Sequence, residues 1–354
     1  MSPPAPLELF VSGRVCLFGE HSDWAATHRP PGSNSAPGLC LAAGTDLGIT
    51  SLARPLDGYL EVVGPNGETA QIRATPANLV QTANEGGFFS YAAGTLAELM
   101  ARYPQVTGLQ IRTTAMTLPL KKGLSSSAAI CVSVARACNQ LFGLGLDTPA
   151  IMDIAFAGER RTPSMCGRLD QVCAYGRQAV SMTFDRDTVA ITPVVIGQPI
   201  HLILVDLGGE KDTVQILDDL QRCFPDTPGP LAAGVRRALS DLNHALVLRA
   251  ASALSTGDAA ELGRLMDEAQ GAFDRWVAPA SPTQLGSPRL KSLLTWPSLR
   301  PHICGGKGMG SQGDGVAQLI VRDAQKQRLA CEIIESGLGM QTMPMMLQQT
   351  FTGS

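Results

Sequence analysis

The sequence of 354 residues has no apolar run near the ~20 residues that cross a bilayer as a helix, so we expect no membrane-spanning segment. It also has no Cys-x-x-Cys pair. Its nine cysteines are scattered through apolar segments, which predicts reduced, buried small residues instead of disulfides or zinc ligands. Residues 1–6 have neither the basic nor the apolar region of a signal peptide, which predicts a cytoplasmic protein. The net charge of −3 lacks the basic excess of a nucleic-acid-binding protein, so we expect neither nucleic acid nor membrane as a partner.

Composition and length indicate a globular protein with two domains. Apolar residues make up 44% of the chain and charged residues 17%, as in ordinary globular proteins. A chain of 354 residues is long enough for two domains of usual size. The stretch Ile-Gly-Gln-Pro at 196–199 has the composition of a linker, and a new strand is expected over 200–207. We therefore predict domains at 1–197 and 198–354.

Two common nucleotide-binding motifs are missing. No G-x-x-x-x-G-K-[ST] segment occurs, and Gly308-x-Gly310-x-x-Gly313 matches the dinucleotide fingerprint in letters only. That fingerprint has to open a helix, whereas residues 316–321 have the pattern of a strand. The six glycines within 305–315 still require a special backbone. They suit a loop that holds phosphates or supports another loop, or else a tight connection between strands.

A serine-rich stretch precedes an apolar segment with helical spacing. Residues 119–129 read Pro-Leu-Lys-Lys-Gly-Leu-Ser-Ser-Ser-Ala-Ala, and the apolar segment ends at 142–143. The first N–H groups of such a helix have no internal acceptor and favour a bound anion. Gly123 permits close approach of a phosphate, and the hydroxyls of 125–127 can contact phosphate or magnesium. The alternative is a serine-capped core helix that needs no ligand.

A strand expected over residues 9–18 ends in a polar loop. Glu20, His21 and Asp23 place two carboxylates and an imidazole within four residues, a set that can bind several hydroxyls of one small ligand. The alternative is a solvated turn. Residues 24–38, rich in Pro, Gly and Ser, predict a loop that is either a lid over the ligand or a surface excursion.

Two more carboxylates lie near the end of a predicted helix and just after it. The pattern predicts a helix over 148–161, capped by Thr148. Glu159 and Asp170 flank the Pro- and Gly-containing loop after it, so both could point into one site. Each could equally be a surface carboxylate.

Taken together, these motifs resemble the GHMP small-molecule kinases, the family of galactokinase, homoserine kinase, mevalonate kinase and phosphomevalonate kinase. Residues 13–23 resemble the family's first motif, in the form found in sugar kinases, and residues 119–129 match its second motif. Phe-Ser-Tyr-Ala-Ala-Gly at 89–94 is similar to the Asn-Tyr-Val-x-Gly stretch of galactokinases. The resemblance implies an α+β fold of two domains, a ribosomal-S5-domain-2-like N-terminal domain and a ferredoxin-like C-terminal domain.

The resemblance also implies an ATP-dependent kinase, with ATP and Mg²⁺ bound. It implies Asp170 and Arg14 as catalytic residues, Ser127 and Glu159 as magnesium ligands, and Glu20, His21 and Asp23 as substrate ligands. The nucleotide contacts that it implies are Gly123, Leu124, Ser125, Ser126, Ser127 and Tyr91.

The substrate expected from this resemblance is a monosaccharide, neutral or a uronic acid, phosphorylated at its anomeric hydroxyl. A mevalonate-type kinase is the first alternative, although its branched acid needs fewer hydroxyl partners. An inactive sugar- or nucleotide-binding member is the second, although such a protein needs no metal ligand or base. The third family motif, usually Gly-Ala-Gly-x-Gly-Gly, carries Lys307, Gln312 and Asp314 here and leaves the substrate open. Arg29 could pair with a uronic acid if its loop closes, or could be solvated.

Overall fold

The structure is a computed structural model that describes residues 5–33, 35–118, 123–164 and 166–349. Residues 119–122 of the serine-rich stretch therefore lie outside the described residues, whereas Gly123 and the three serines that follow lie inside. All nine cysteines are free and buried or partly buried, which confirms their interpretation as small residues of the interior. No helix in the described part of the chain is long and apolar enough to cross a membrane.

The chain forms two compact units. The first contains Met1–Arg14 and Gly44–Gly176, and the second contains Val15–Ala43 and Arg177–Ser354. Strands β1 (Leu7–Phe18) and β2 (Gly38–Pro55) each contribute to both units. The boundary between residues 197 and 198 stays a prediction about the division into domains.

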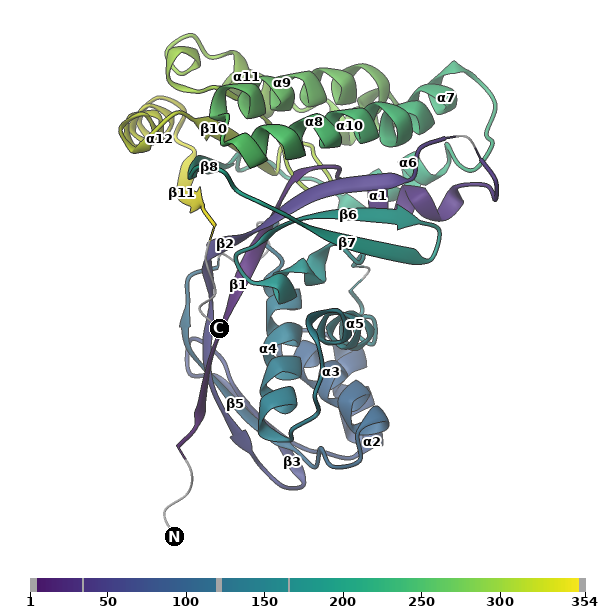
Figure 1. Ribbon diagram of the computed structural model, residues 1–354, viewed down its shortest axis with the longest axis vertical. Coiled ribbons are helices and arrows are strands. Elements are labelled where there is room, and N and C mark those ends of the chain that lie inside the picture. The colour runs from purple at the N-terminus through teal and green to yellow at the C-terminus, as the bar shows by residue number, and fades with distance from the viewer. Residues whose placement is uncertain (1–4, 34, 119–122, 165, 350–354) are drawn as a thin grey trace. The chain divides into compact units, whose positions relative to one another are not determined.

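The first unit is a sheet with helices beside it (Figure 1). Its strand order is β4-β3-β5-β2, in which β3 and β5 are parallel and the other pairs antiparallel. The strands are β3 (Tyr59–Val63), β4 (Thr69–Arg73) and β5 (Leu109–Met116), with the later part of β2. The helices are α2 (Pro76–Glu85), α3 (Phe88–Arg102), α4 (Ser126–Leu141) and α5 (Thr148–Glu159), followed by the 3₁₀ turn η2 (Asp170–Tyr175).

Helix α4 packs against α3, α5 and η2. Ten of its residues are buried, and they lie on every face of the helix, as the apolar segment after the serines predicts. Helices α3 and α5 touch through two glycines, because a Cβ on Gly94 would lie 2.4 Å from the carbonyl oxygen of Gly158. This close contact fixes the end of α5, where Glu159 lies. The cap of α5 is Asp147, whose carboxylate accepts from the N–H of Ala150, so the predicted Thr148 cap was wrong by one residue.

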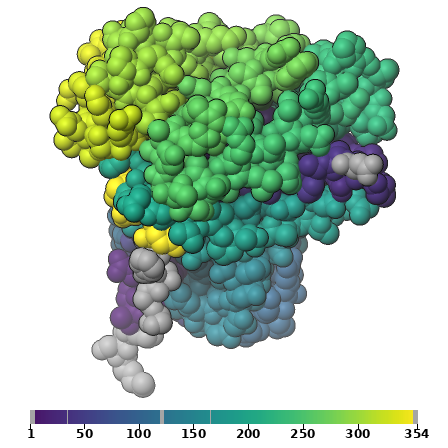
Figure 2. Space-filling view, turned by 45° about the horizontal axis from the view of Figure 1, so that its top comes forward, coloured from purple at the N-terminus to yellow at the C-terminus, as the bar shows by residue number. Residues whose placement is uncertain are grey.

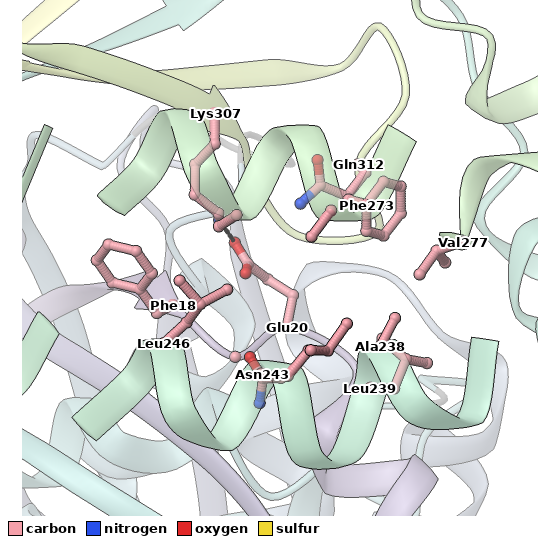
Figure 3. A pocket seen from close by; sticks show the side chains of 14 residues that line it. Phe18, Glu20, Ala238, Leu239, Asn243, Leu246, Phe273, Val277, Lys307 and Gln312 are labelled. Atoms are coloured by element: carbon pink, nitrogen blue, oxygen red, sulfur yellow. Dashed lines mark hydrogen bonds and ion pairs between the residues drawn. The ribbon is translucent and has the colours of Figure 1, made fainter. Parts of the chain in front are cut away.

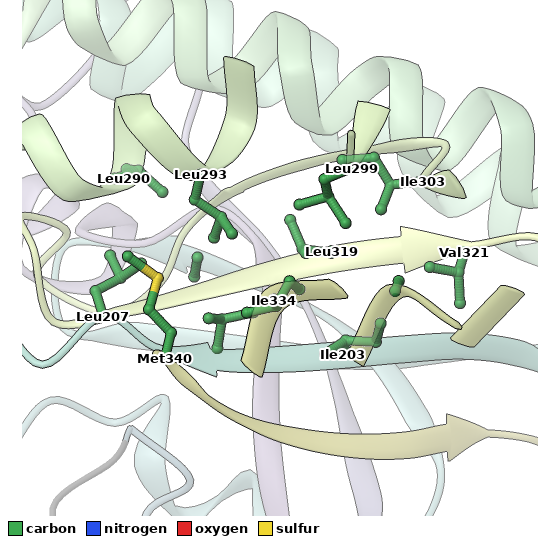
Figure 4. Packing of buried hydrophobic residues seen from close by; sticks show 13 residues of the cluster. Ile203, Leu207, Leu290, Leu293, Leu299, Ile303, Leu319, Val321, Ile334 and Met340 are labelled. Carbon is green, nitrogen blue, oxygen red and sulfur yellow. The ribbon is translucent and has the colours of Figure 1, made fainter. Parts of the chain in front are cut away.

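The second unit contains a four-stranded antiparallel sheet with the order β11-β8-β10-β9. These strands are β8 (Ile200–Asp206), β9 (Gly305–Gly308), β10 (Val316–Val321) and β11 (Gln341–Leu347). If these four strands are numbered 1 to 4 along the chain, their order across the sheet is 4-1-3-2, which is the strand order of a ferredoxin-like fold. Helix α12 (Ala324–Leu338) follows the third strand, and its buried Ile334 packs with Ile203, Leu293 and Leu319 in the core of Figure 4. The predicted ferredoxin-like half is confirmed.

The same unit holds the first part of β2, paired with the hairpin of β6 (Ala179–Asp185) and β7 (Thr188–Val194). Its helices cover much of the surface seen in Figure 2, where they are green to yellow-green. They are α6 (Thr213–Gln221), α7 (Pro230–Arg237), the π turn η3 (Ala238–Leu242), α8 (Asn243–Thr256), α9 (Ala259–Trp276), η4 (Ala278–Ala280), α10 (Pro282–Leu285), α11 (Pro288–Thr295) and η5 (Arg300–His302).

The segment after β1 is more regular than predicted. Residues 24–38 were expected as a loop, but α1 (Ser22–Ala25) and the 3₁₀ turn η1 (Ala26–His28) form its first part. The reason lies in packing: Trp24 contacts the ring of Phe224 edge-on, and Ala25 is buried in the same apolar cluster. Pro and Gly content signals loops only where no apolar side chain anchors the backbone.

Candidate active site

Helix α4 begins without the serine cap that its sequence allows. Ser125 precedes the helix in the left-handed region, at φ 56°, and its side chain caps no N–H of the first turn. Its hydroxyl instead donates to Oδ1 of Asp170, at 2.6 Å. Gly123, at φ 77°, has a backbone conformation that favours glycine. This geometry favours the anion-binding interpretation of the serine-rich stretch over a simple capped helix.

Arg14 connects β1 to this loop and to Asp170. Its Nη1 donates to the carbonyl oxygen of Gly123 at 2.8 Å, and its main-chain N–H donates to the carbonyl oxygen of Leu124 at 3.2 Å. Its Nη2 forms an ion pair with Oδ1 of Asp170. The Arg14 side chain is 9% exposed and that of Asp170 is 24% exposed. The carboxylate is therefore positioned by a buried cation and still reachable from solvent.

Glu159 lies at the end of α5, only 1% exposed, and it accepts three hydrogen bonds from neutral groups. The Ser127 hydroxyl donates to Oε1 at 2.7 Å, the Ser164 hydroxyl to Oε1 at 3.2 Å and Nε2 of Gln171 to Oε2 at 2.8 Å. Burial raises the pKa of Glu159, the charge of Asp170 raises it further, and the three hydrogen bonds oppose the rise.

Ser127, Glu159 and Asp170 were expected together from the family resemblance, and the structure does bring them together in the first unit. We call Arg14, Ser125, Ser127, Glu159 and Asp170 the serine–carboxylate cluster. Sequence reasoning missed Ser164 and Gln171. Gln171 directly follows Asp170 and could have been suspected from that position, whereas nothing in the sequence marks Ser164.

Tyr91 lies on α3, partly buried, within electrostatic range of Glu159. Burial raises the pKa of its phenol, and the nearby Glu159 charge raises it further. Its main-chain carbonyl accepts from the hydroxyl of Thr95. The nucleotide contact expected of Tyr91 stays a prediction.

The second unit holds the other polar residues of interest. Glu20 and Lys307 form a buried ion pair, with Nζ of Lys307 2.5 Å from Oε1 of Glu20 (Figure 3). The Lys307 side chain is 3% exposed and that of Glu20 is 7% exposed. Nζ of Lys307 also donates to the carbonyl oxygen of Gly308 at 3.0 Å. Nζ of Lys211 donates to the carbonyl oxygen of Gln312 at 2.8 Å. We call Glu20, His21, Lys211, Lys307 and Gln312 the lysine cluster.

His21 is buried against aromatic rings. Its ring stacks on Phe273 at a centroid distance of 6.2 Å, and Nδ1 accepts from Nε1 of Trp24 at 3.0 Å. Burial lowers the pKa of His21 to about 4, and the positive charges of Lys211 and Lys307 add to this shift. The ring is therefore neutral at pH 7 and carries its hydrogen on Nε2.

Asp23 is only partly buried, and its Oδ1 accepts from the N–H of Trp24 at 2.9 Å. Glu20, His21 and Asp23 thus follow β1 in the second unit, and their substrate contacts stay predictions. Arg29 is held by its own loop, because it donates to the carbonyl oxygens of Ser33 and Ser35 and pairs with Asp185 at 3.0 Å. These contacts favour a structural role over carboxylate recognition.

The glycine-rich loop of the third family motif connects two antiparallel strands, β9 and β10, which confirms that it is no dinucleotide fingerprint. Asp314 in this loop accepts from the N–H groups of Arg289 and Leu290 at 3.2 and 3.0 Å and so caps α11. Of the three unusual residues of the third family motif, Asp314 therefore has a structural explanation. The other two, Lys307 and Gln312, belong to the lysine cluster.

Comparison with known proteins finds a family model that matches part of the chain. Residues 90–177 match the sequence family described as GHMP kinases N terminal domain. A galactokinase of Haemophilus influenzae (strain PittGG) is 25% identical over 216 residues, which cover 59% of this chain and 52% of the relative. The match thus spans about half the length of that protein.

Two solved structures share the fold. Lactococcus lactis galactokinase complexed with galactose superposes with a TM-score of 0.71 at 17% identity, covering 96% of this chain and 92% of that one. L. major mevalonate kinase in complex with R-mevalonate also gives 0.71, at 19% identity, covering 99% of both chains.

Proposed function

We propose that this chain, a member of the GHMP kinase superfamily, transfers a phosphoryl group from ATP to a small polyhydroxylated metabolite, a monosaccharide at its anomeric hydroxyl. The observation that carries the proposal is the serine–carboxylate cluster at the start of α4. Two carboxylates, an arginine and an uncapped helix N-terminus meet there. Phosphoryl transfer needs mainly positioning and charge neutralisation, and these groups supply both.

Asp170 accepts the proton of the sugar hydroxyl in this mechanism. Its carboxylate is held by Arg14 and by the hydroxyl of Ser125, both on Oδ1, and is partly exposed. The fixed position lets the carboxylate orient the acceptor hydroxyl for attack, and Arg14 offsets the negative charge that accumulates there. The main-chain N–H groups from Gly123 to Ser127 would bind the phosphates, with Tyr91 beside the nucleotide.

Ser127 and Glu159 fit a magnesium ion, because both offer the hard oxygen atoms that this ion prefers. The described residues contain no group of three or more His, Cys, Asp or Glu side chains placed for a metal. Mg²⁺ commonly uses one or two carboxylates and completes its coordination with water and phosphate oxygens, so a two-residue site is sufficient. The bound ion would supply neutralisation of phosphate charge. Ser164 and Gln171 hold Glu159 in place through hydrogen bonds.

ATP consumption across a panel of free sugars, uronic acids and mevalonate tests the proposal, with Asp170→Asn as the matched inactive variant. We expect turnover with at least one sugar or uronic acid and a product that no longer reduces alkaline copper, because phosphate at the anomeric oxygen blocks ring opening. Turnover of mevalonate alone would overturn the sugar assignment. Binding of sugar and ATP with no turnover of any acceptor would favour the inactive alternative.

A further inference from the structure

The second unit contains a cavity large enough for a small molecule. Its volume is about 320 Å³, whereas the cavity shown in Figure 3 measures about 50 Å³. Sites for small molecules usually measure ~300–1,000 Å³. Every residue that lines the larger cavity belongs to the second unit, from the segments 25–33, 35–38, 224–226 and 236–241. We call it the α7 cavity, after the helix that carries two of its arginines.

Two walls of the α7 cavity are joined by a hydrogen bond. One wall is the segment after α1, and the other consists of the end of α7 and the π turn η3. The N–H of Ala36 in the first wall donates to Oδ1 of Asp241 in the second, at 2.9 Å. The first wall is also fixed internally, because Arg29 donates to the carbonyl oxygens of Ser33 and Ser35. A ligand that enters a cavity with fixed walls loses little free energy to ordering them.

The second wall contains a turn of π-helix. Leu239, Ser240 and Asp241 of η3 all line the cavity, at the point where α7 passes into α8. The hydroxyl of Ser240 donates to the carbonyl oxygen of Arg236 at 2.8 Å. Single π turns within helices are rare and frequently occur at functional sites. The turn therefore supports a binding role for this wall.

Two arginines at the end of α7 supply hydrogen-bond donors to the lining. Arg236 is partly buried, and its Nη1 donates to the carbonyl oxygens of Cys223 and Thr227. This leaves the hydrogens of Nε and Nη2 for a ligand. Arg237 is exposed and has no hydrogen bond or ion pair within the part of the chain that the structure describes. Guanidinium groups with free N–H groups bind phosphate and carboxylate groups in particular.

The balance of charge in the lining is positive. Its charged residues are Arg29, Arg236, Arg237, Asp226 and Asp241. Arg29 pairs with Asp185 outside the lining, but Arg186 also lies 3.9 Å from that carboxylate, so two arginines share it. Both aspartates of the lining are exposed, whereas the Arg29 side chain is only 19% exposed and Arg236 is partly buried. Because solvent screens exposed charges more strongly, the positive charges dominate inside and favour an anionic group.

The remaining lining suits an uncharged body that carries hydroxyls. Ala25 and Leu239 are buried in one apolar cluster, against which the ring of Phe224 packs, and C–H groups of a ligand can contact this surface. Asp226 has no partner among the described residues, and Asp241 uses only Oδ1. A carboxylate can only accept hydrogen bonds, so these two residues require donors on the ligand, such as hydroxyls.

We propose that the α7 cavity binds a sugar phosphate, with the phosphate on Arg236 and Arg237 and sugar hydroxyls on Asp226 and Asp241. A neutral sugar would leave the guanidinium charges without a partner, and inorganic phosphate would leave the carboxylates and the apolar surface without contacts. The inference goes beyond the proposed function, because the lining contains no residue of the serine–carboxylate cluster.

Isothermal titration calorimetry without nucleotide tests the inference. Glucose 1-phosphate, galactose 1-phosphate, glucose 6-phosphate, glucose and inorganic phosphate are each titrated into wild type, Arg237→Met, Asp226→Ala and Arg328→Met. Arg328 is the matched control, because it is also an exposed arginine on a helix of the second unit, without a partner in the described ranges, but lies outside the lining.

We expect wild type to bind at least one sugar phosphate at least about tenfold more tightly than glucose or inorganic phosphate. Arg237→Met should weaken this binding about 10- to 100-fold, the range for a charge-assisted hydrogen bond, and Arg328→Met should not change it. Asp226→Ala should weaken binding of the sugar phosphate about 3- to 10-fold and should not weaken binding of inorganic phosphate, because that ion has no sugar hydroxyls to donate.

Sugar-phosphate binding that is absent in wild type, unchanged in Arg237→Met or equally weakened in Arg328→Met would contradict the inference. Preference for inorganic phosphate over every sugar phosphate would also contradict it, because the cavity would then be a simple anion site. A sugar 1-phosphate bound as a reaction product elsewhere would be unaffected by Arg237→Met. The kinase proposal is tested separately: turnover in Arg237→Met at low product should stay within about twofold of wild type, and absence of turnover in wild type would remove that proposal without affecting the binding result.

Discussion

The two clusters hold their carboxylates in opposite ways. In the serine–carboxylate cluster, Glu159 is surrounded by neutral hydroxyl and amide donors, which can turn to other partners at low cost. In the lysine cluster, Glu20 is locked to Lys307 in a buried ion pair. A carboxylate with neutral donors can exchange them for a cation, whereas breaking a buried ion pair leaves an unpaired charge. The first arrangement therefore suits a carboxylate that binds and releases a ligand, and the second suits a carboxylate that makes a fixed structural contact.

The largest expected effect comes from Asp170→Asn, which changes the chemical step. The amide cannot accept the proton of the sugar hydroxyl, so kcat should fall by roughly two to four powers of ten while substrate binding stays nearly intact. Steady-state kinetics with direct binding of ATP and sugar checks this split. A loss below about tenfold in kcat would show that Asp170 is not the base.

The contrast in carboxylate environments predicts different costs for removing a partner. Lys307→Met should reduce the free energy of unfolding by about 3–5 kcal/mol, because Glu20 would remain buried without its cation. The double variant Lys307→Met/Glu20→Gln should recover most of this loss, because no buried charge is left. Urea denaturation of the wild type, both single variants and the double variant measures the coupling. Additive effects would mean that the two side chains do not stabilise each other.

Glu159→Gln should cost little stability and mainly affect magnesium. Its present partners are neutral donors, but the variant removes an anionic oxygen from the expected ion site. The Mg²⁺ concentration for half-maximal rate should rise about 10- to 100-fold, and Ser127→Ala should show a weaker effect in the same direction. An unchanged magnesium dependence would remove Glu159 from the site.

The smallest effect concerns His21 and pH. The pKa of this residue is about 4 in the folded chain against an ordinary value of 6.5, so the unfolded state binds more protons between these two values. The free energy of unfolding should therefore rise with pH from about 4 to 6.5, by up to ~1.4 kcal/mol per pH unit, and His21 should add no slope above that window. His21→Gln should flatten the rise. His28→Gln, in the same helical segment but outside the lysine cluster, is the control, and equal flattening in both variants would contradict the assignment.

The sequence predicted the first cluster better than the second. Ser127, Glu159 and Asp170 were expected at one site from motifs whose residue types and order carry the family resemblance, whereas the hydrogen bond from Ser125 to Asp170 was not predicted. Glu20 and Lys307 are 287 positions apart, and their ion pair depends on a loop that departs from the family pattern, so no local signal joins them. The strands expected over 9–18, 200–207 and 316–321 match β1, β8 and β10 to within two residues, because their apolar patterns are strong. The helical turns after β1 were missed because their stability comes from Trp24 packing against a distant phenylalanine, Phe224.

The account places the chemical step in the serine–carboxylate cluster, and one measurement tests that claim directly. The kcat/KM values for a uronic acid and for its neutral sugar are determined in wild type and Asp170→Asn. We expect Asp170→Asn to lower both values by at least about a hundredfold with an unchanged ratio. A loss below about tenfold for the accepted substrate would contradict the claim.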